Sequence, residues 1–459
     1  MSVVLRPYQD EAVDAALAAV QAKKNGIIVM PTGSGKSLVI SGIAQRANAN
    51  IIVLQPTKEI LEQNARKLYE LGFHNIGIFS ASAGAKRPAQ VTFATIGTII
   101  TKLDRFPDTD IVIVDECHLV NAKGGEYNSL IKHFGKPTIG LTATPYRMAA
   151  SFQGAVVEAK FLHRTRPRIF NHVSFIVQND DLHSAGYLSP IEYTENKGYN
   201  PYAIALKSTG LNYDERALLA YNKAQGICQK AADVVIGNLD SIRHCLIFVS
   251  AISESQQIET ILRHAGVSVA HIDGKTPKAE RARILTAFKA GQIKVVTNVG
   301  VLTTGFDFPA LDTVVLARPT MSLPLYYQMV GRGVRCAPGK DTCRVHDLCG
   351  NVPRFGHPEE YRIESDGGPK HRLRSGKRYL TGVNFVTGRD LEKRREKRAE
   401  QKRKITEGDV ITFGKHKGTK ITDAPTGYLQ WCAENFDDGN WKSVFRQELT
   451  RRQQGISAS

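Results

Sequence analysis

Cysteine is scarce in this sequence, and long hydrophobic runs are absent. Seven cysteines are scattered through 459 residues, and no two of them form a Cys-x-x-Cys pair. This spacing argues against a disulfide framework and a structural zinc site, and it favours reduced thiols. The longest apolar runs, such as residues 111–114, have only the length of buried strands. We therefore expect no transmembrane span and no membrane partner.

Acidic residues are outnumbered. The chain has 61 Lys and Arg against 44 Asp and Glu, a net charge of +17, which favours polyanionic partners such as nucleic acid. Residues 370–404 alone hold 14 Lys and Arg against 4 Asp and Glu. This run is either a solvated basic linker or a phosphate-binding segment, and its composition leaves both readings open.

Two blocks of the sequence alternate short apolar strands with helical stretches. The first block has expected strands at 26–30, 51–55, 76–79, 91–94, 111–114 and 138–141. The second has them at 245–249, 267–271, 294–297, 313–317 and 344–347. Ile- and Val-rich strands of this kind are buried on both faces, as in a parallel sheet wrapped by helices. The pattern predicts an α/β protein with two such sheets.

A glycine-rich loop follows the first expected strand and precedes a helical stretch. This strand, loop and helix order is what a phosphate-binding loop requires, and a chance Gly-Lys-Ser would lack it. The loop residues expected to bind ATP are Thr32, Gly33, Ser34, Gly35, Lys36 and Ser37. Lys36 would reach the β- and γ-phosphates, and the Ser37 hydroxyl would bind Mg²⁺.

Two adjacent carboxylates, Asp115 and Glu116, end a buried strand. One carboxylate is enough to bind the Mg²⁺ of a nucleotide, so Asp115 is the expected metal ligand. Glu116 is then a base able to polarise the attacking water. His118 follows two residues later and either has a structural role or couples hydrolysis to the next motif.

The order PTGSGKS, DECH and LTATP resembles that of the superfamily 2 helicases. The resemblance covers residues 1–355 and implies two tandem RecA-like parallel-sheet domains with helices on both faces, and hydrolysis of ATP with Mg²⁺. It assigns adenine recognition to Gln9, further nucleotide contacts to Arg6, Gly305 and Asp307, and coupling to His118, Thr142 and Thr144.

The same resemblance assigns catalytic roles to Gln328, Arg332 and Arg335, of which Arg335 is the expected arginine finger. It also assigns nucleic-acid backbone contacts to residues of both halves: Pro56, Thr57, Thr95, Gly97, Gly274, Thr297 and Thr303.

The expected organisation has five parts. Residues 1–165 form the first RecA-like domain, 166–240 a linker with a helical insertion, and 241–355 the second RecA-like domain. Residues 356–405 form a basic linker, and 406–459 form a small C-terminal module.

The wording of several motifs, including VLTTGFD and APGK, is similar to that of RadD-type DNA-repair ATPases. Those proteins continue into cysteine-rich sequence that is missing here. The C-terminal pattern FGKHKG, DAP and YLQW resembles a small module of exonuclease X-like proteins. Lys415 and Lys417 would bind nucleic-acid backbone there, whereas Tyr428 and Trp431 either stack on bases or form the core of the module.

These resemblances predict an ATP-dependent DNA helicase or translocase that unwinds or branch-migrates DNA in repair, recombination or replication. The alternatives are an RNA-dependent remodelling ATPase and a DNA-bound scaffold whose ATPase only switches its affinity. We expect single-stranded, forked or branched DNA as partner, with RNA as the alternative, and a repair or single-strand-binding protein as a further partner. The residues after Met1 lack a secretory signal. We therefore expect a cytoplasmic protein, nucleoid-associated in a prokaryote or in the cytoplasm of a virus-infected host cell. We also expect it to be a monomer.

Overall fold

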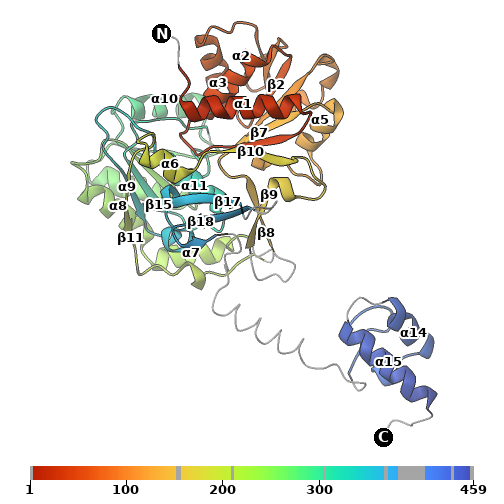
Figure 1. Ribbon diagram of the computed structural model, residues 1–459. Coiled ribbons are helices and arrows are strands. Elements are labelled where there is room, and N and C mark those ends of the chain that lie inside the picture. Colours follow the sequence, from red (N-terminus) through yellow and green to blue (C-terminus); the bar gives the residue numbers. More distant parts are fainter. Residues whose placement is uncertain are drawn as a thin grey trace. The chain divides into compact units, whose positions relative to one another are not determined.

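The computed structural model divides into two compact units, Met1–Val386 and Thr387–Ser459 (Figure 1). The structure describes residues 4–150, 157–207, 211–303, 305–365, 371–380, 409–435 and 439–454. Each unit is described by itself below. Most of the basic run at 370–404 lies outside the described residues, so its expected role stays a prediction.

The first sheet of the large unit has eight strands in the order β10-β1-β7-β6-β2-β5-β3-β4. All neighbours are parallel except β4, which runs antiparallel to β3. Its strands are β1 (Gly26–Val29), β2 (Ile51–Gln55), β3 (Ile76–Ser80), β4 (Ala85–Arg87), β5 (Val91–Thr95), β6 (Ile111–Asp115), β7 (Thr138–Thr142) and β10 (His172–Ile176). The helices around it are α1 (Pro7–Gln21), α2 (Lys36–Ala47), α3 (Lys58–Glu70), α4 (Ile96–Ile99), α5 (Glu126–Phe134) and α6 (Asn179–Ser184).

The second sheet has six parallel strands in the order β11-β16-β15-β12-β14-β13. These are β11 (Ile191–Glu195), β12 (Cys245–Val249), β13 (Val269–Ile272), β14 (Val295–Asn298), β15 (Thr313–Ala317) and β16 (Cys343–Asp347). The helices that follow or precede them are α7 (Glu215–Ala224), α8 (Ile227–Gly237), α9 (Ile252–His264), α10 (Lys278–Lys289), α11 (Leu323–Val330) and α12 (Asn351–Phe355). Two RecA-like parallel sheets with surrounding helices are the fold class that the sequence predicts.

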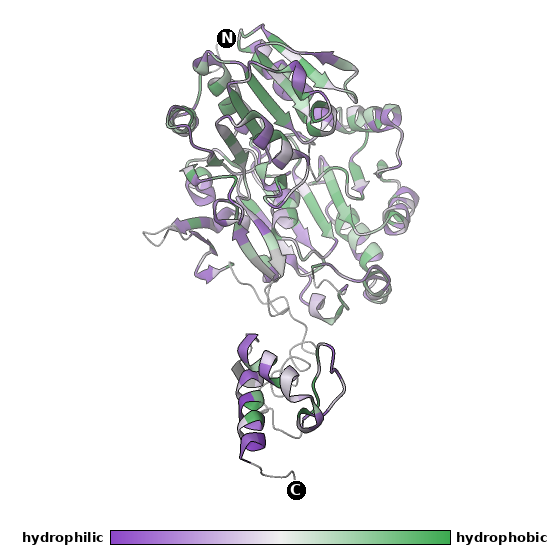
Figure 2. Ribbon diagram, turned by 90° about the vertical axis from the view of Figure 1, so that its right-hand side faces the viewer, coloured by the Kyte–Doolittle hydropathy of each residue, from purple (hydrophilic) through white to green (hydrophobic). Residues whose placement is uncertain are grey.

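The central strands form because their side chains can be buried on both faces. Every residue of β2, β6, β12 and β15 is buried, and these strands consist largely of Ile, Val, Leu and Phe. Figure 2 shows the hydrophobic colour concentrated on the strands and the hydrophilic colour on the outer helices. In parallel sheets of this kind, the loops at the carboxyl ends of the strands form the ligand-binding site.

The segment 166–240 does more than link the two sheets. β10 pairs with β1 at the edge of the first sheet, and β11 pairs with β16 at the edge of the second. Only α7 and α8 correspond to the helical insertion that the sequence predicts. Both strands lie at sheet edges and are only partly buried, so neither carries the continuous apolar run that marks the central strands.

Residues 356–405, expected as a basic linker, include a three-stranded antiparallel sheet where the structure describes them. Its strands are β17 (Tyr361–Ser365), β18 (His371–Ser375) and β19 (Arg378–Tyr379). Alternate residues such as Tyr361 and Leu373 are buried within the large unit. The intervening Arg and Glu side chains are paired, for example Arg374 with Glu364 at 2.7 Å. A separate two-stranded antiparallel sheet pairs β8 (Tyr146–Ala150) with β9 (Val157–Phe161).

The small unit contains α14 (Thr426–Asn435) and α15 (Gly439–Gln453) around a compact core. That core is built from Ile411, Ile421, Ala424, Leu429, Cys432, Ala433, Val444 and Phe445. Trp441 packs on it through an edge contact with Phe413. Trp431, by contrast, is 58% exposed, so it is not a core residue of this unit.

All seven cysteines are free thiols. Across the described ranges, no helix combines the length and the apolarity that a membrane crossing needs.

Candidate active site

The phosphate loop lies between β1 and α2. Ser34 closes it, since the Ser34 hydroxyl donates to the Pro31 carbonyl at 2.7 Å. Lys36 Nζ lies 3.4 Å from the carbonyl oxygens of Met30 and Pro31. The Lys36 ammonium is thus held at the base of the loop, where its remaining donor capacity faces the cleft.

Two glycines give this loop its curvature. Gly33 and Gly35 have φ values of 86° and 87°, in the left-handed region that other residues avoid. A Cβ at Gly35 would also lie 2.5 Å from Gln9 Nε2. A side chain at this position would therefore push Gln9 away from the loop.

Arg6 and Gln9 lie beside the loop, as predicted for the adenine side of the site. The Gln9 amide and the Tyr8 hydroxyl donate to the Ser34 carbonyl at 2.9 and 2.8 Å. The Arg6 guanidinium lies 4.3 Å above the Tyr187 ring. Gln9 is buried, and both ends of its amide are engaged, since Gln9 Oε1 accepts from the Arg6 N–H at 2.9 Å. Gln9 thus holds the outer end of the loop in this structure, and adenine recognition stays a prediction.

Asp115 and Glu116 end β6 opposite the phosphate loop. Asp115 is buried, and its Oδ1 accepts a hydrogen bond from the Glu116 backbone N–H at 3.0 Å. Glu116 has φ 50° and ψ 50°, an uncommon left-handed conformation for a residue with a side chain. Strained backbone of this kind persists where the surroundings hold a functional group in one orientation. It places Glu116 Oε1 4.0 Å from Lys36 Nζ.

The pKa values of the two carboxyl groups are shifted in opposite directions. Burial raises the pKa of Asp115, and the charge of Glu116 raises it further. Burial also acts to raise the pKa of Glu116, but Lys36 and His118 outweigh it and lower that pKa overall. Glu116 is therefore the ionised member, and an ionised carboxylate can accept a hydrogen bond from a water molecule and orient it.

His118 connects Glu116 to the end of β7. Its Nδ1 lies 3.1 Å from Glu116 Oε2, 3.0 Å from Thr142 Oγ1 and 3.3 Å from Thr144 Oγ1. The Thr144 N–H donates to Thr142 Oγ1 at 3.0 Å. The three residues predicted as coupling elements thus form one network around the Glu116 side chain.

The second domain contributes cations to the same cleft. Arg332 donates to the Phe306 carbonyl at 2.6 Å, and Arg335 forms an ion pair with Asp307. Burial lowers the pKa of both arginines to about 10, so both stay charged at neutral pH. Gln328 lies one helical turn before Arg332, and only its backbone carbonyl contacts that arginine.

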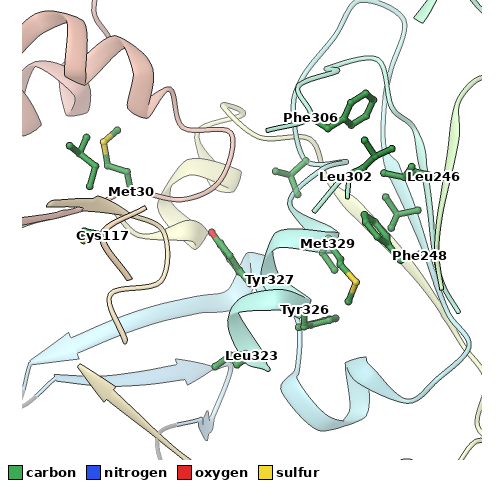
Figure 3. Packing of buried hydrophobic residues seen from close by; sticks show 14 of the residues in the cluster. Met30, Cys117, Leu246, Phe248, Leu302, Phe306, Leu323, Tyr326, Tyr327 and Met329 are labelled. Atoms are coloured by element: carbon green, nitrogen blue, oxygen red, sulfur yellow. The ribbon is translucent and has the colours of Figure 1, made fainter. Parts of the chain in front are cut away.

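The two domains touch directly at the site. The Thr32 N–H donates to the Tyr327 hydroxyl at 3.3 Å, and that hydroxyl donates to Asn179 at 2.6 Å. Figure 3 shows Tyr327 pointing from α11 toward the first domain, while Met329 points into the core of the second. Gln63 of α3 donates to Asp307 at 2.6 Å, which adds a second contact between the domains.

A cavity of about 290 Å³ lies between the two sets of residues. The predicted residues lining it are Thr32, Gly33, Gly35, Lys36, Ser37, Asp115, Glu116, Gly305, Asp307, Arg332 and Arg335. Together with Lys67, which also lines the cavity, the basic side chains outnumber the acidic ones by four to three, which suits a polyphosphate. The Ser37 hydroxyl and the Asp115 carboxylate are the hard oxygen ligands that Mg²⁺ prefers. The residues therefore fit a magnesium nucleotide.

One wall of this cavity was missed by sequence reasoning. It is the face of α3 formed by Ile60, Gln63, Asn64 and Lys67. Positions 60, 63, 64 and 67 follow a helical period, so a signal was present. Such a stripe ordinarily indicates a core-facing helix surface, and nothing in the sequence distinguishes it from a cavity wall.

The residues predicted to contact nucleic acid divide into two groups. Thr57 and Gly274 come from different domains and line one cavity of about 760 Å³, together with Arg281 and Lys289. Thr95 ends β5 beside β2, at the sheet edge that also carries Pro56, and Gly97 is in the following α4.

Two other residues of that prediction are not accessible. Thr297 is fully buried, and its hydroxyl accepts from Ser255 at 2.7 Å. Thr303 is only 8% exposed. In this conformation both side chains are buried and are not presented to a ligand.

Two RecA-like domains enclose one cavity whose lining suits a polyphosphate, the arrangement expected of a helicase-type nucleotide hydrolase. Family comparisons agree. Residues 2–147 match the family described as "Type III restriction enzyme, res subunit", and residues 228–337 match "Helicase conserved C-terminal domain". The two matched segments lie one in each RecA-like domain and support an ATPase of the superfamily 2 helicase type.

Among curated proteins, the chain is 25% identical to IRC3 of Saccharomyces cerevisiae over 385 residues, whose name describes an ATP-dependent helicase. That match covers 79% of this chain and 54% of IRC3, so the chain spans about half the length of that relative. It is 26% identical to a 51.5 kDa protein of a Lactococcus phage, covering 74% and 69% of the two chains. It is 23% identical to XPB2 of Sulfurisphaera tokodaii, named a DNA 3'-5' translocase, covering 72% and 79%.

Solved structures show the same fold. An HsdR-subunit fragment of a type I restriction enzyme from Vibrio vulnificus matches with a TM-score of 0.58 and 22% identity, covering 80% of this chain and 68% of that one. Dbp5 of S. cerevisiae matches with a TM-score of 0.51 and 18% identity, covering 76% and 87%. At these identities the likeness concerns the fold alone.

Proposed function

We propose that this enzyme binds ATP with Mg²⁺ between its two domains and uses hydrolysis to move along or remodel DNA. The observation that carries the proposal is the convergence of both domains on one cavity. Lys36, Ser37 and Glu116 face it from one side, and Arg332 and Arg335 from the other. Closing and opening of such a cleft changes the distance between the domains with each hydrolysis cycle.

The proposed division of roles follows the contacts. Lys36 binds the β- and γ-phosphates, and Ser37 and Asp115 bind Mg²⁺, which neutralises phosphate charge. Glu116, oriented by Lys36 and His118, holds the attacking water. Arg332 and Arg335 stabilise the charge that develops on the transferred phosphoryl group. The threonine network around His118 would relay the state of this site to the nucleic acid.

DNA is the preferred substrate for two reasons. XPB2 is named as acting on DNA, and several motifs resemble the RadD-type DNA-repair ATPases. Both point to repair, recombination or fork processing in the cytoplasm or nucleoid. The cavity that joins Thr57 and Gly274 supports a backbone-binding track that crosses both domains, with little sequence preference.

A panel of nucleic acids tests this function. Single-stranded, duplex and forked DNA should each raise the steady-state ATPase rate more than RNA of the same length does. The Lys36→Ala variant should show no hydrolysis with any of them, because the phosphate contact is lost. Stimulation by RNA alone would overturn the DNA assignment. Stimulated ATPase without unwinding or branch migration would favour the scaffold alternative.

The small unit is the proposed second DNA contact. Lys415 and Lys417 are exposed on one loop, and His416 between them packs on Tyr428 at 4.5 Å between ring centroids. Tyr428 lies one helical turn from the exposed Trp431. Tyr428 is half-buried and packs against the core of the unit, so Trp431 is the ring available for stacking. Exposed lysines and an exposed aromatic ring suit backbone contact with base stacking, as in the module of exonuclease X-like proteins that this pattern resembles.

Replacing Lys415 and Lys417 together by Ala should weaken single-stranded DNA binding and flatten its salt dependence. The slope of log Kd against log salt should fall by about 1.4, because each phosphate contact contributes about 0.7. Fluorescence anisotropy at several salt concentrations measures it. The matched control replaces Lys132 and Lys136, two exposed lysines of the first domain. Equal slopes for the two double variants would remove the small unit from the binding surface.

A further inference from the structure

Lys67 extends from the last turn of α3 into the nucleotide cavity. Its ammonium donates to the hydroxyl of Ser37, the last residue of the phosphate loop, at 2.9 Å. No motif assigns a role to this position. The ordinary reading is that a lysine in the last turn stabilises the carboxyl end of its helix.

The charge environment of Lys67 differs from that of the other cations in the cavity. Lys36 faces Glu116, and Arg335 is paired with Asp307. Among the described residues, no carboxylate oxygen lies within 4.0 Å of Lys67 Nζ, the distance at which an ion pair forms. Burial lowers the pKa of Lys67, the charge of Arg335 lowers it further, and the charge of Glu70 offsets these effects only in part.

An ammonium group has three donors, and the Ser37 hydroxyl accepts only one of them. A partly buried cation with spare donors is stabilised by an anion, and the carboxylate that acts on its charge, Glu70, forms no ion pair with it. The phosphate subsite of the same cavity is the place where an anion would lie. The flexible four-carbon stem of a lysine allows the ammonium to follow such an anion.

We propose that Lys67 is a second lysine ligand for the phosphate chain of the bound nucleotide, opposite Lys36. The inference rests on the proposed function, because it takes Lys36 and Ser37 to mark the phosphate subsite. It adds α3 to the elements that bind the nucleotide. The same helix begins directly after Thr57, a predicted nucleic-acid contact, and Thr57 Oγ1 accepts from the Ile60 N–H at 3.3 Å.

The test compares affinities for ATP, ADP and AMP, each with Mg²⁺, by isothermal titration calorimetry. Lys67→Met keeps the apolar stem and removes the charge. It should weaken ATP and ADP binding by about 10- to 100-fold, the loss expected for a charge-assisted hydrogen bond, and leave AMP binding unchanged. Lys58→Met is the matched control, since Lys58 begins the same helix and pairs with Glu62 at 3.4 Å, outside the cavity.

Three results decide the matter. A larger loss for ATP and ADP than for AMP supports the proposal. Unchanged binding, or an equal loss for all three nucleotides, overturns it in favour of a structural role. A partly unfolded variant changes the fraction of active protein but not the ratio of the dissociation constants, and Lys67→Gln repeats the measurement with a polar side chain. Lys36→Ala is measured in parallel: if it too binds ATP normally, the phosphate subsite itself is misassigned.

Discussion

Replacing Arg335 by Ala is expected to lower kcat for ATP hydrolysis by about 10³-fold or more, the range measured for arginine fingers. Arg335 lines the cavity from the second domain and stays charged, since its pKa of about 10 lies well above neutral. The affinity for ATP should change by only a few fold, because the finger acts mainly on charge that develops during phosphoryl transfer. Steady-state kinetics with saturating nucleic acid, together with ATP titration, separate the two effects.

The variant should not disturb the fold around it. The Arg335 carbonyl accepts from the Ser189 hydroxyl at 2.9 Å, and this contact survives truncation of the side chain. Arg283→Ala provides the control, because Arg283 is exposed on α10 and pairs with Glu280. If Arg335→Ala keeps kcat within about tenfold of the parent enzyme, far short of the loss that a finger implies, the role passes to Arg332.

Replacing Glu116 by Gln should reduce kcat by about 10²- to 10⁴-fold, the contribution typical of a positioned base. Gln has the same shape, so contacts with His118 and Thr142 can persist while the negative charge is removed. Lys36 then loses the carboxylate that lies 4.0 Å away, which leaves its charge free for phosphate. ATP should therefore bind at least as tightly as before, and the variant should accumulate in the ATP-bound form.

Single-turnover kinetics with a nucleotide-binding assay distinguish this outcome from general damage. Glu126→Gln, an exposed carboxylate in the first turn of α5, is the control and should behave like the parent enzyme. Normal turnover by Glu116→Gln would move the water-orienting role to another group. A simultaneous loss of ATP binding would mean that Glu116 maintains the loop structure and not the chemistry.

The central parts of both sheets could be predicted from the sequence because their physics is local. Strands such as β2 and β12 are short, nearly continuous apolar runs, which the sequence shows directly. A phosphate loop needs its glycines and its lysine within one short segment, so it is equally easy to recognise. The acidic pair at Asp115 and Glu116 was equally visible, since it directly follows a buried strand.

The remaining parts depend on packing between distant segments. Tyr327 resembles any aromatic residue of an amphipathic helix, and only the fold brings its hydroxyl to Thr32. The cavity-facing row of α3 has the period of a core stripe. Thr297 was predicted to contact nucleic acid, but it lies in the interior strand β14 and is fully buried. In each case the sequence shows where the residue lies along the chain, but only the folded structure shows which residues surround it.

The placement of β10 determines where this chain can be cut into independent parts. A fragment ending at residue 165, the boundary suggested by composition, would omit β10 and leave the outer edge of β1 unpaired. β1 is Gly-Ile-Ile-Val and is buried along its whole length. Its unpaired edge would expose free backbone N–H and C=O groups and promote aggregation with other chains. A fragment extended through Val177, whose N–H donates to the Val29 carbonyl at 3.0 Å, keeps that edge covered.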